Sequence, residues 1–477
     1  MKLCSTTAVR ILSVCAAGCG IATMGLLAGG AAPATPAAEA ATPRPDFSKV
    51  PADGKGAFVT GKYRDLFAED GHTEAEIDAK IAKAYNQLFH GDHDTQTIMF
   101  AGPKNDNGPT AYIVDIQHDD IRSEGMSYGM MITVQLDKKE DFDALWNWSR
   151  TFMYHDDPKH PTYGYFSWQM RNDGTAMSEN PAPDGEEYYA MALLFAANRW
   201  GSGKGIYDYK AEGLKLLHNM VHREQITGQA GGRGRGQTMG PEVSEDPPMI
   251  LFSPNRGAGT DASYHLPAFY ELWSRWGPSE DREFWAKAAI ASRDFFYFSA
   301  DAKTGLIPNQ ARVPTAEALL RGPVPAASAP ATQPGGAGAG RRGGFGGGFG
   351  GGGFMEDAWR CASNWSVDWI WWGKDPREQE LSDRIQAFFE SQGMDNYNDN
   401  FRLDGTPTRQ RHSPGLVSTN GVASLAAKDK DRAKKFTEAL WNLDVPQGFL
   451  FQYYDGLLYM MSLMHESGRF RVIMPKQ

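Results

Sequence analysis

Cysteine is scarce in this 477-residue chain, which contains four. Three of them, Cys4, Cys15 and Cys19, precede residue 20, so the rest of the chain keeps Cys361 alone. A single thiol cannot form an internal disulfide, and the fold must therefore be held by its core. A chain of this length is long enough to bury a core of the necessary size.

Positive charge is also in deficit, because 48 Lys and Arg residues face 58 Asp and Glu residues, a formal net charge of -10. Such a chain is a poor match for the phosphate backbone, and we expect no nucleic-acid partner. After residue 27 no run of 18 apolar residues remains, which excludes an integral membrane protein. A hydrophobic content of 41% nevertheless predicts a globular chain, not a disordered one.

The N-terminus has the pattern of a secretory leader. Lys2 and Arg10 accompany an apolar run over 11–27, and small residues with several A-x-A cleavage points follow. We predict that residues 1–42 are a signal peptide and processed leader and that the protein is exported, to the periplasm or the medium. A lipoprotein anchor at Cys19 is a less favoured alternative, because the apolar run continues past it.

Apolar residues recur with helical spacing in twelve segments, whereas strand alternation is nearly absent. The predicted helices lie near 73–90, 122–136, 139–154, 184–200, 208–222, 261–276, 281–299, 356–372, 376–391, 416–427, 431–442 and 453–467. Every second segment is the more apolar and aromatic one, as expected of a buried helix. The sequence therefore predicts an all-α domain over 43–477, with six inner and six outer helices in two rings.

Two glycine-rich segments interrupt this pattern. Residues 335–353 include 13 Gly among 19 residues and follow a Pro- and Ala-rich stretch. Because this composition cannot repay the entropy of ordering, we predict a flexible insertion at about 323–354. A shorter Gly and Arg segment at 228–237 receives the same interpretation. Binding of RNA by these segments is the less favoured alternative.

Acidic residues occur near the predicted starts of four inner helices: Glu124, Asp184, Asp261 and Asp357. Helix capping is the simplest interpretation, because carboxylates satisfy free N–H groups there. Glu124, however, precedes an apolar, Met-rich stretch in which burial would raise the pKa of its carboxyl, as a general acid requires. Carboxylates combined with Tyr and Trp, without a nucleophile motif, are typical of polysaccharide hydrolysis.

The motifs around these residues resemble those of glycoside hydrolase family 8. They are SEGMSYGMM at 123–131, PAPDGEEYYAMALLFA at 181–196, SYHLPAFYELW at 263–273 and DAWR at 357–360. The segment GAFVTGKYRDLF at 56–67 is similar to the reducing-end xylose-releasing branch of that family. The resemblance extends to the C-terminus and implies an (α/α)6 barrel and an inverting mechanism, in agreement with the twelve predicted helices.

The resemblance also implies roles for individual residues. Glu124 matches the general acid and Asp357 the general base. Asp184 matches an acidic residue that grips the sugar at the cleavage point. Tyr264 matches a ring that helps to hold the attacking water, and Arg360 is expected to orient Asp357.

Further substrate contacts are expected from neighbouring residues. Trp168 is a candidate stacking platform, because Tyr165 and Phe166 suggest a rim of rings, although core packing is an alternative. His412, in RQRHSPGLVSTNG, resembles the loop that blocks one end of the cleft in exo-acting members, with a purely structural role as the alternative. The candidate set is completed by three residues of the same motifs, Tyr128, Asp261 and His265.

The sequence thus predicts an exported, inverting glycoside hydrolase that releases xylose from the reducing end of β-1,4-xylo-oligosaccharides and acts as a monomer. No metal and no cofactor is expected, because HExxH, clustered Cys or His at ligand spacing and a phosphate-binding loop were not identified. One alternative is an endo-acting family 8 xylanase, cellulase or chitosanase. Another is a non-catalytic sugar-binding protein on the same barrel, which would be marked by the loss of a carboxylate.

Overall fold

The computed structural model describes residues 42–45, 53–230, 236–255, 257–320 and 352–476, and Thr42–Gln477 forms one unit. The predicted leader, its anchor alternative at Cys19 and most of the predicted 323–354 insertion lie outside the described residues. Within the described part of the chain, no helix combines the length and apolar character needed to cross a membrane.

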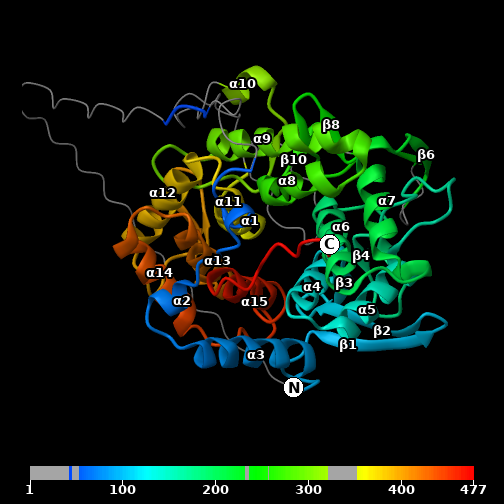
Figure 1. The fold of residues 1–477 in the computed structure, drawn as a ribbon, viewed down its shortest axis with the longest axis horizontal. Coiled ribbons are helices and arrows are strands. Elements are labelled where there is room, and N and C mark those ends of the chain that lie inside the picture. The colour runs from blue at the N-terminus through cyan, green and yellow to red at the C-terminus, as the bar shows by residue number, and fades with distance from the viewer. Residues whose placement is uncertain (1–41, 46–52, 231–235, 256, 321–351, 477) are drawn as a thin grey trace, which may run out of the picture. The chain divides into compact units, whose positions relative to one another are not determined.

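Twelve of the helices in the described part of the chain form two rings (Figure 1). The inner ring consists of α4 (Ser123–Gln135), α6 (Pro183–Trp200), α8 (Pro267–Trp276), α11 (Arg360–Trp372), α13 (Pro414–Val422) and α15 (Tyr454–Glu466). The outer ring consists of α3 (Glu74–His90), α5 (Lys139–Trp148), α7 (Tyr209–His222), α9 (Arg282–Ser299), α12 (Arg377–Gln392) and α14 (Lys430–Asn442). All twelve predicted segments are helical, and the (α/α)6 barrel is confirmed.

The two rings differ in burial as the sequence predicts. In α4 every residue except Glu124 is buried, and in α15 every residue except Tyr454 is buried. In the outer helix α3 the buried residues instead follow one face, at the spacing of Ile77, Ile81 and Leu88. A helix enclosed on all sides must be apolar all round, whereas an outer helix needs only one apolar stripe.

Short elements complete the helical part. They are α1 (Ala57–Thr60), α2 (Leu66–Glu69), α10 (Ala316–Leu320), a π-helical turn (Ser149–Met153) and 3-10 turns at Gly205–Tyr207, Ala262–Tyr264, Ser279–Asp281, Glu356–Trp359 and Ala423–Leu425. The predicted helix over 261–276 is thus divided into a turn and α8. The division falls before Pro267, which has no N–H and begins a new helix readily.

The structure contains more strand than the sequence pattern indicated. An antiparallel sheet runs in the order β1 (Met99–Asn105), β2 (Gly108–Asp115), β3 (Asp120–Arg122), β4 (Gln169–Met170) and β5 (Ala176–Ser178). Four ribbons are formed by β6 (Ile226–Gln229) with β7 (Gly236–Met239), β8 (Val243–Glu245) with β9 (Pro248–Ile250), β10 (Gly259–Thr260) with β11 (Ala311–Arg312), and β12 (Asn400–Phe401) with β13 (Pro407–Arg409). Most of these strands are too short to show a period of two.

The structure also corrects the predicted ends of both glycine-rich segments. Gly228 and Gln229 lie in β6, which pairs with β7, so the described ends of the 228–237 segment are ordered. At the other insertion, Phe354 is buried and forms an antiparallel bridge with Phe401. Its ring packs into the core, which explains why the chain is fixed there despite the preceding glycines.

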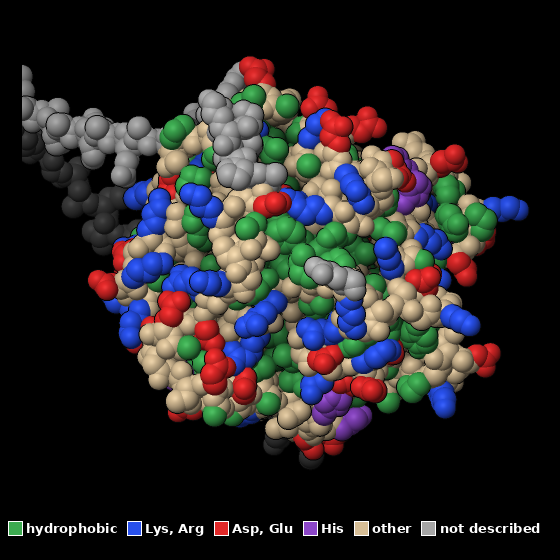
Figure 2. Space-filling view, viewed as in Figure 1, with side chains coloured by type: hydrophobic (Ala, Val, Ile, Leu, Met, Phe, Trp, Pro, Cys, Tyr) green, Lys and Arg blue, Asp and Glu red, His purple; other side chains and the backbone are tan. Residues whose placement is uncertain are grey.

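The chain following α15 covers the C-terminal ends of two inner helices (Figure 1). Gln135 Nε2 donates to the carbonyl of Arg471 at 2.9 Å, and Asn198 Nδ2 donates to that of Ile473 at 2.7 Å. On this face, charged side chains of both signs are interspersed around a central group of hydrophobic ones (Figure 2). The N-terminal ends of the inner helices therefore lie at the opposite rim.

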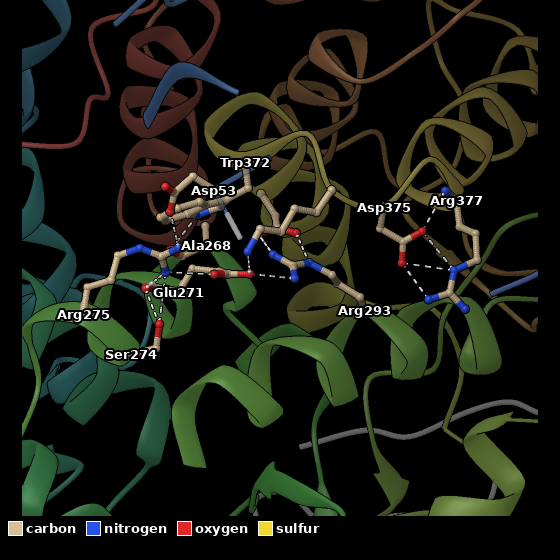
Figure 3. A network of polar contacts seen from close by, with 11 residues as sticks. Asp53, Ala268, Glu271, Ser274, Arg275, Arg293, Trp372, Asp375 and Arg377 are labelled. Carbon is tan, nitrogen blue, oxygen red and sulfur yellow. Dashed lines mark hydrogen bonds and ion pairs between the residues drawn. The ribbon is translucent and has the colours of Figure 1, made fainter. Parts of the chain in front are cut away.

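A buried network of charged side chains joins α8, α9 and α11 (Figure 3). Arg293 Nε and Nη2 donate to Asp368 at 2.6 and 2.8 Å, and Arg293 Nη1 donates to Glu271 at 2.9 Å. Glu271 also accepts from Lys374 at 2.7 Å and from Arg275 at 3.0 Å. Burial alone would raise the pKa of Glu271, but Arg293 and Lys374 hold it below its ordinary value.

Replacing the central cation should destabilise the barrel strongly. We expect Arg293→Leu to lower the free energy of unfolding by about 3 to 5 kcal/mol, because it removes both bonds from Arg293 to the buried Asp368 and one of the three cations that bind Glu271. Denaturant unfolding followed by circular dichroism measures this loss. Lys287→Ala, which breaks an exposed pair with Glu283 on the same helix, is the control and should change stability little. Equal small losses in both variants would contradict the importance of the network.

Candidate active site

Three carboxylates gather at the N-terminal rim of the inner ring. Glu124 is the second residue of α4 and follows β3 directly, and Asp184 is the second residue of α6, after Pro183. Asp357 lies in the 3-10 turn that leads into α11. Glu124 and Asp184 are therefore placed by the first turn of an inner helix, where the helix dipole favours negative charge, and Asp357 by the turn that leads into one.

Arg360, the first residue of α11, binds all three carboxylates. Its Nη1 lies 3.1 Å from Glu124 Oε2 and 2.9 Å from Asp184 Oδ2, and its Nη2 lies 3.1 Å from Asp357 Oδ1. The arginine side chain is 5% exposed. A planar guanidinium can donate to several acceptors in fixed directions, so it can hold groups that would otherwise repel one another. The sequence prediction gave Arg360 a single partner, and the structure shows three.

Glu124 and Asp357 differ in exposure. They bind different nitrogens of the same guanidinium, Nη1 and Nη2. The Asp357 side chain is 33% exposed and that of Glu124 is 15% exposed. Water therefore has better access to Asp357, and Glu124 lies in the drier position.

Burial raises the pKa of Glu124 to about 8. Arg360 opposes this shift, whereas the negative charges of Asp184 and Asp357 add to it. Tyr453 donates its hydroxyl hydrogen to Glu124 Oε1 at 3.2 Å. A carboxyl group with such a pKa is largely protonated at neutral pH and is suited to donate a proton.

Asp184 and two tyrosines surround the arginine. Burial raises the pKa of Asp184, whose Oδ1 accepts from the Gly185 amide at 3.0 Å. Tyr264 packs against the guanidinium, with the Arg360 Cζ 5.7 Å from its ring centroid. The Tyr128 hydroxyl accepts a hydrogen bond from Arg360 Nη1, and its ring is buried. Tyr128 therefore holds Arg360 in position, and its contact with substrate stays a prediction.

Asp261 and His265, the other two residues predicted to bind substrate, are both fully buried. Asp261 Oδ1 accepts from the amide and the hydroxyl of Ser263 at 2.8 and 2.7 Å, which caps the following turn. The ring nitrogens of His265 are 2.9 Å from the hydroxyls of Thr260 and Ser292. Burial raises the pKa of Asp261 and lowers that of His265 to about 3, so both belong to the wall behind the site.

Trp168 lies beside the carboxylates and is half-buried. Its carbonyl accepts from the Ser123 amide at 3.0 Å, immediately before Glu124, and the Arg122 guanidinium lies 5.8 Å from its ring centroid. The argument that suggested it was wrong, because Tyr165 and Phe166 are buried in the core instead of forming a rim. Its own position nevertheless remains suitable for stacking on a sugar.

His412 is half-buried and oriented by Tyr397. Its Nδ1 is 2.8 Å from the Tyr397 carbonyl, and the two rings meet edge to face at 4.6 Å. Because a carbonyl can only accept, Nδ1 carries a hydrogen, and in the tautomer that this contact selects Nε2 is the acceptor. The side chain is thus held in one orientation with one polar atom available.

The loop that carries His412 is fastened to the turn that carries Asp357. Arg409 and Arg411 lie 2.7 and 3.9 Å from Glu356 Oε1, one residue before Asp357. Both arginines also bind Asp399, which is fully buried. The structure therefore places the predicted blocking loop next to the predicted base.

Three further residues at the rim of the carboxylates were not predicted from the sequence. Ser263 accepts from Arg360 Nη2 at 2.7 Å, Tyr453 binds Glu124, and Tyr454 donates to the Glu356 carbonyl at 3.1 Å. A Cβ at Gly125 would lie 2.5 Å from the Tyr453 ring, so only glycine permits this approach. Tyr453 immediately precedes α15 and Tyr454 is its first residue, the same kind of position at which the sequence suggested the carboxylates.

Paired carboxylates on an (α/α)6 barrel define this protein as a glycoside hydrolase. The family model for glycosyl hydrolases family 8 matches residues 114–321. The chain is 40% identical over 421 residues to the reducing-end xylose-releasing exo-oligoxylanase of Paenibacillus barcinonensis, covering 88% of this chain and 99% of that protein. It is 37% identical over 425 residues to that of Halalkalibacterium halodurans, covering 88% and 97%. The protein belongs to glycosyl hydrolases family 8.

A solved structure agrees with this assignment. The family 8 xylobiose complex from Teredinibacter turnerae matches with a TM-score of 0.78 and 43% sequence identity. The match covers 88% of this chain and 100% of that chain. The similarity therefore includes both the barrel and the rim that carries the three carboxylates.

The pH profile should reflect the protonation of Glu124. We expect kcat/KM for a soluble oligosaccharide to fall as the pH rises through about 8, because the proton of Glu124 is lost there. Asp184→Asn removes a charge that raises the pKa of Glu124 and should move this alkaline limb to lower pH. Asp94→Asn, a change at an exposed site, is the control and should leave the limb in place. A limb unaffected by Asp184→Asn would contradict the coupling.

Proposed function

We propose that this protein is an inverting glycoside hydrolase that releases xylose from the reducing end of β-1,4-linked xylo-oligosaccharides. The observation that carries the proposal is the arrangement of Glu124, Asp184 and Asp357 around Arg360. The reaction type follows from this geometry and from the raised pKa of Glu124. The substrate follows from relatives of that activity that match the chain over almost their whole length.

In the proposed mechanism, protonated Glu124 donates its proton to the glycosidic oxygen and the bond to the anomeric carbon breaks. A water molecule attacks that carbon from the opposite face while Asp357 accepts its proton, so the product has inverted configuration. Arg360 orients Asp357 through the contact of its Nη2 with Asp357 Oδ1 at 3.1 Å. Asp184 binds the sugar at the cleavage point and favours its distorted ring.

Known complexes of relatives support a xylo-oligosaccharide substrate. The Paenibacillus barcinonensis enzyme has been solved with xylose, at 38% identity and a TM-score of 0.73. The Teredinibacter turnerae protein has been solved with xylobiose. Trp168 and Tyr264 are the rings that we assign to sugar contacts in this chain, since flat aromatic faces stack on pyranose rings.

A second candidate function is endo-acting xylan hydrolysis. It is favoured by one observation, a catalytic mutant of the Teredinibacter turnerae xylanase solved with xylohexaose, at 42% identity. The loop of His412 separates the two candidates. A loop that closes the cleft beyond the first sugar on the leaving-group side allows release of one xylose at a time, and its available Nε2 would accept from the anomeric hydroxyl.

Substituting the two catalytic carboxylates should abolish turnover without unfolding the protein. We expect Glu124→Gln and Asp357→Asn each to lower kcat by about 10² to 10⁴-fold, because each keeps its shape but cannot transfer a proton. Reducing-sugar release from xylotriose measures the rate, and thermal unfolding verifies the fold. Asp184→Ala should lower kcat and also raise KM.

Asp261→Asn is the matched control for these substitutions. Asp261 is a carboxyl of the same rim, but it is fully buried and bonded to Ser263, so the variant should keep most of its activity. Substantial activity in Asp357→Asn combined with inactivity in Asp261→Asn would transfer the role of the base to Asp261.

The direction of attack is tested with matched trimers. Xylotriose should yield xylose and xylobiose, whereas the same trimer reduced to its alditol should be cut poorly, because it lacks the ring and the anomeric hydroxyl that His412 recognises. Polymeric xylan should lose viscosity slowly. His412→Ala should narrow the difference between oligomers and polymer. Rapid release of fragments of mixed length from xylan would overturn the exo proposal and favour the endo-acting candidate.

We also propose that the enzyme is exported and monomeric. Export is supported by the charged, apolar and small-residue pattern of residues 1–42. An exported hydrolase would meet oligosaccharides in the periplasm or the medium, where other hydrolases release them from polymers.

A further inference from the structure

A second cluster of chemistry-bearing side chains lies on the outer ring. His218 and His222 are separated by one turn at the end of α7, on the same face of the helix. Asp281 ends the 3-10 turn before α9. One potential ligand atom from each of the three residues lies within 4.8 Å of the others. In the described part of the chain, this is the one group of three or more such residues that meets that spacing.

One oxygen of the Asp281 carboxylate lacks a hydrogen-bond partner among the described residues. The residue is 1% exposed, and its Oδ1 is in contact with His222 Nε2. Its Oδ2 is shielded from solvent and has no hydrogen-bond partner among the described residues. Although Asp281 occupies the N-cap position of α9, its side chain does not cap the helix. An unpaired buried carboxylate oxygen is costly, so Asp281 Oδ2 is a group that a bound cation would stabilise.

The two histidines are accessible to an incoming ion. Their side chains are 52% and 43% exposed, and their rings lie 4.9 Å apart. Glu280 lies beside them, with its Oε1 3.6 Å from His218 Nδ1. Two imidazoles and a carboxylate, with a further carboxylate or water within reach, provide the four ligands of a tetrahedral zinc site.

We propose that His218, His222 and Asp281 bind a divalent transition-metal ion of the zinc class. Two imidazole ligands favour zinc, copper or nickel over calcium and magnesium, which prefer oxygen ligands. The ion would connect the end of α7 to the beginning of α9, two outer helices, whereas the catalytic carboxylates open inner helices. Its role is therefore to fasten the outer ring and not to take part in hydrolysis.

The test is metal titration of the tag-free, full-length protein after treatment with EDTA. Calorimetry with Zn²⁺ should show one site, and Co²⁺ should give the visible absorption of tetrahedral coordination. Zn²⁺ at a hundredfold excess over its Kd should raise the thermal midpoint by about 2 to 4 °C. His218→Gln should weaken Zn²⁺ binding at least about tenfold and remove most of this thermal shift. Because His218 is half exposed, this variant should fold normally without metal.

His90→Gln is the matched control, because His90 also pairs with an aspartate, Asp141, at 2.8 Å and is similarly exposed. It should leave Zn²⁺ affinity unchanged. Unaltered binding in His218→Gln would overturn the proposal, as would a Kd weaker than about 1 mM for the wild type. Binding that is lost in Glu124→Gln but kept in His218→Gln would place the ion among the catalytic carboxylates and would equally overturn it.

The sequence motifs predicted no metal site, and this pair of histidines was not among the candidate residues. His218 and His222 do have the i, i+4 spacing of ligands on one helix, in the segment HNMVH. Their proposed third partner lies 59 positions beyond His222, and the sequence gives no sign that the two segments meet.

Discussion

One guanidinium, that of Arg360, determines the arrangement of the site. It binds carboxylates from the beginnings of α4 and α6 and from the turn before α11, and each of these groups is partly or fully removed from water. Without the cation, three like charges at this rim would repel one another and pay a large desolvation cost. The barrel must bring three helix ends together within the reach of one side chain. The site is therefore assembled only when the ring of inner helices closes.

The same cation allows two chemically similar groups to do different work. Glu124 lies deep enough for burial to raise its pKa to about 8 despite Arg360, whereas Asp357 is more exposed to the water that it must activate. Tyr128 and Ser263 hold the guanidinium from behind and so control both carboxylates indirectly. Which carboxylate acts as acid and which as base thus depends on how deeply each is buried. That depth is determined by the position at which each inner helix begins.

The barrel and its loops contribute different parts of the function. The inner helices fix the carboxylates, which suit hydrolysis of many glycosides, and family membership alone does not choose among them. The loop of His412 is where we locate the choice between releasing one sugar and cutting within a chain. Its attachment to Glu356 through Arg409 and Arg411 makes it a fixed wall beside Asp357, consistent with the general role of loops on rigid scaffolds.

The sequence by itself determined the twelve helices, their division into inner and outer rings, and the carboxylates at helix starts, because periodicity and capping are encoded in neighbouring residues. Only the tertiary structure decided which side chains face the cleft. It turned Tyr128, Asp261 and His265 inward, formed a sheet in which three of the five strands have only two or three residues, and gave Arg360 a partner 236 positions away. Contacts over such separations depend on how the ring closes, and no local pattern records that.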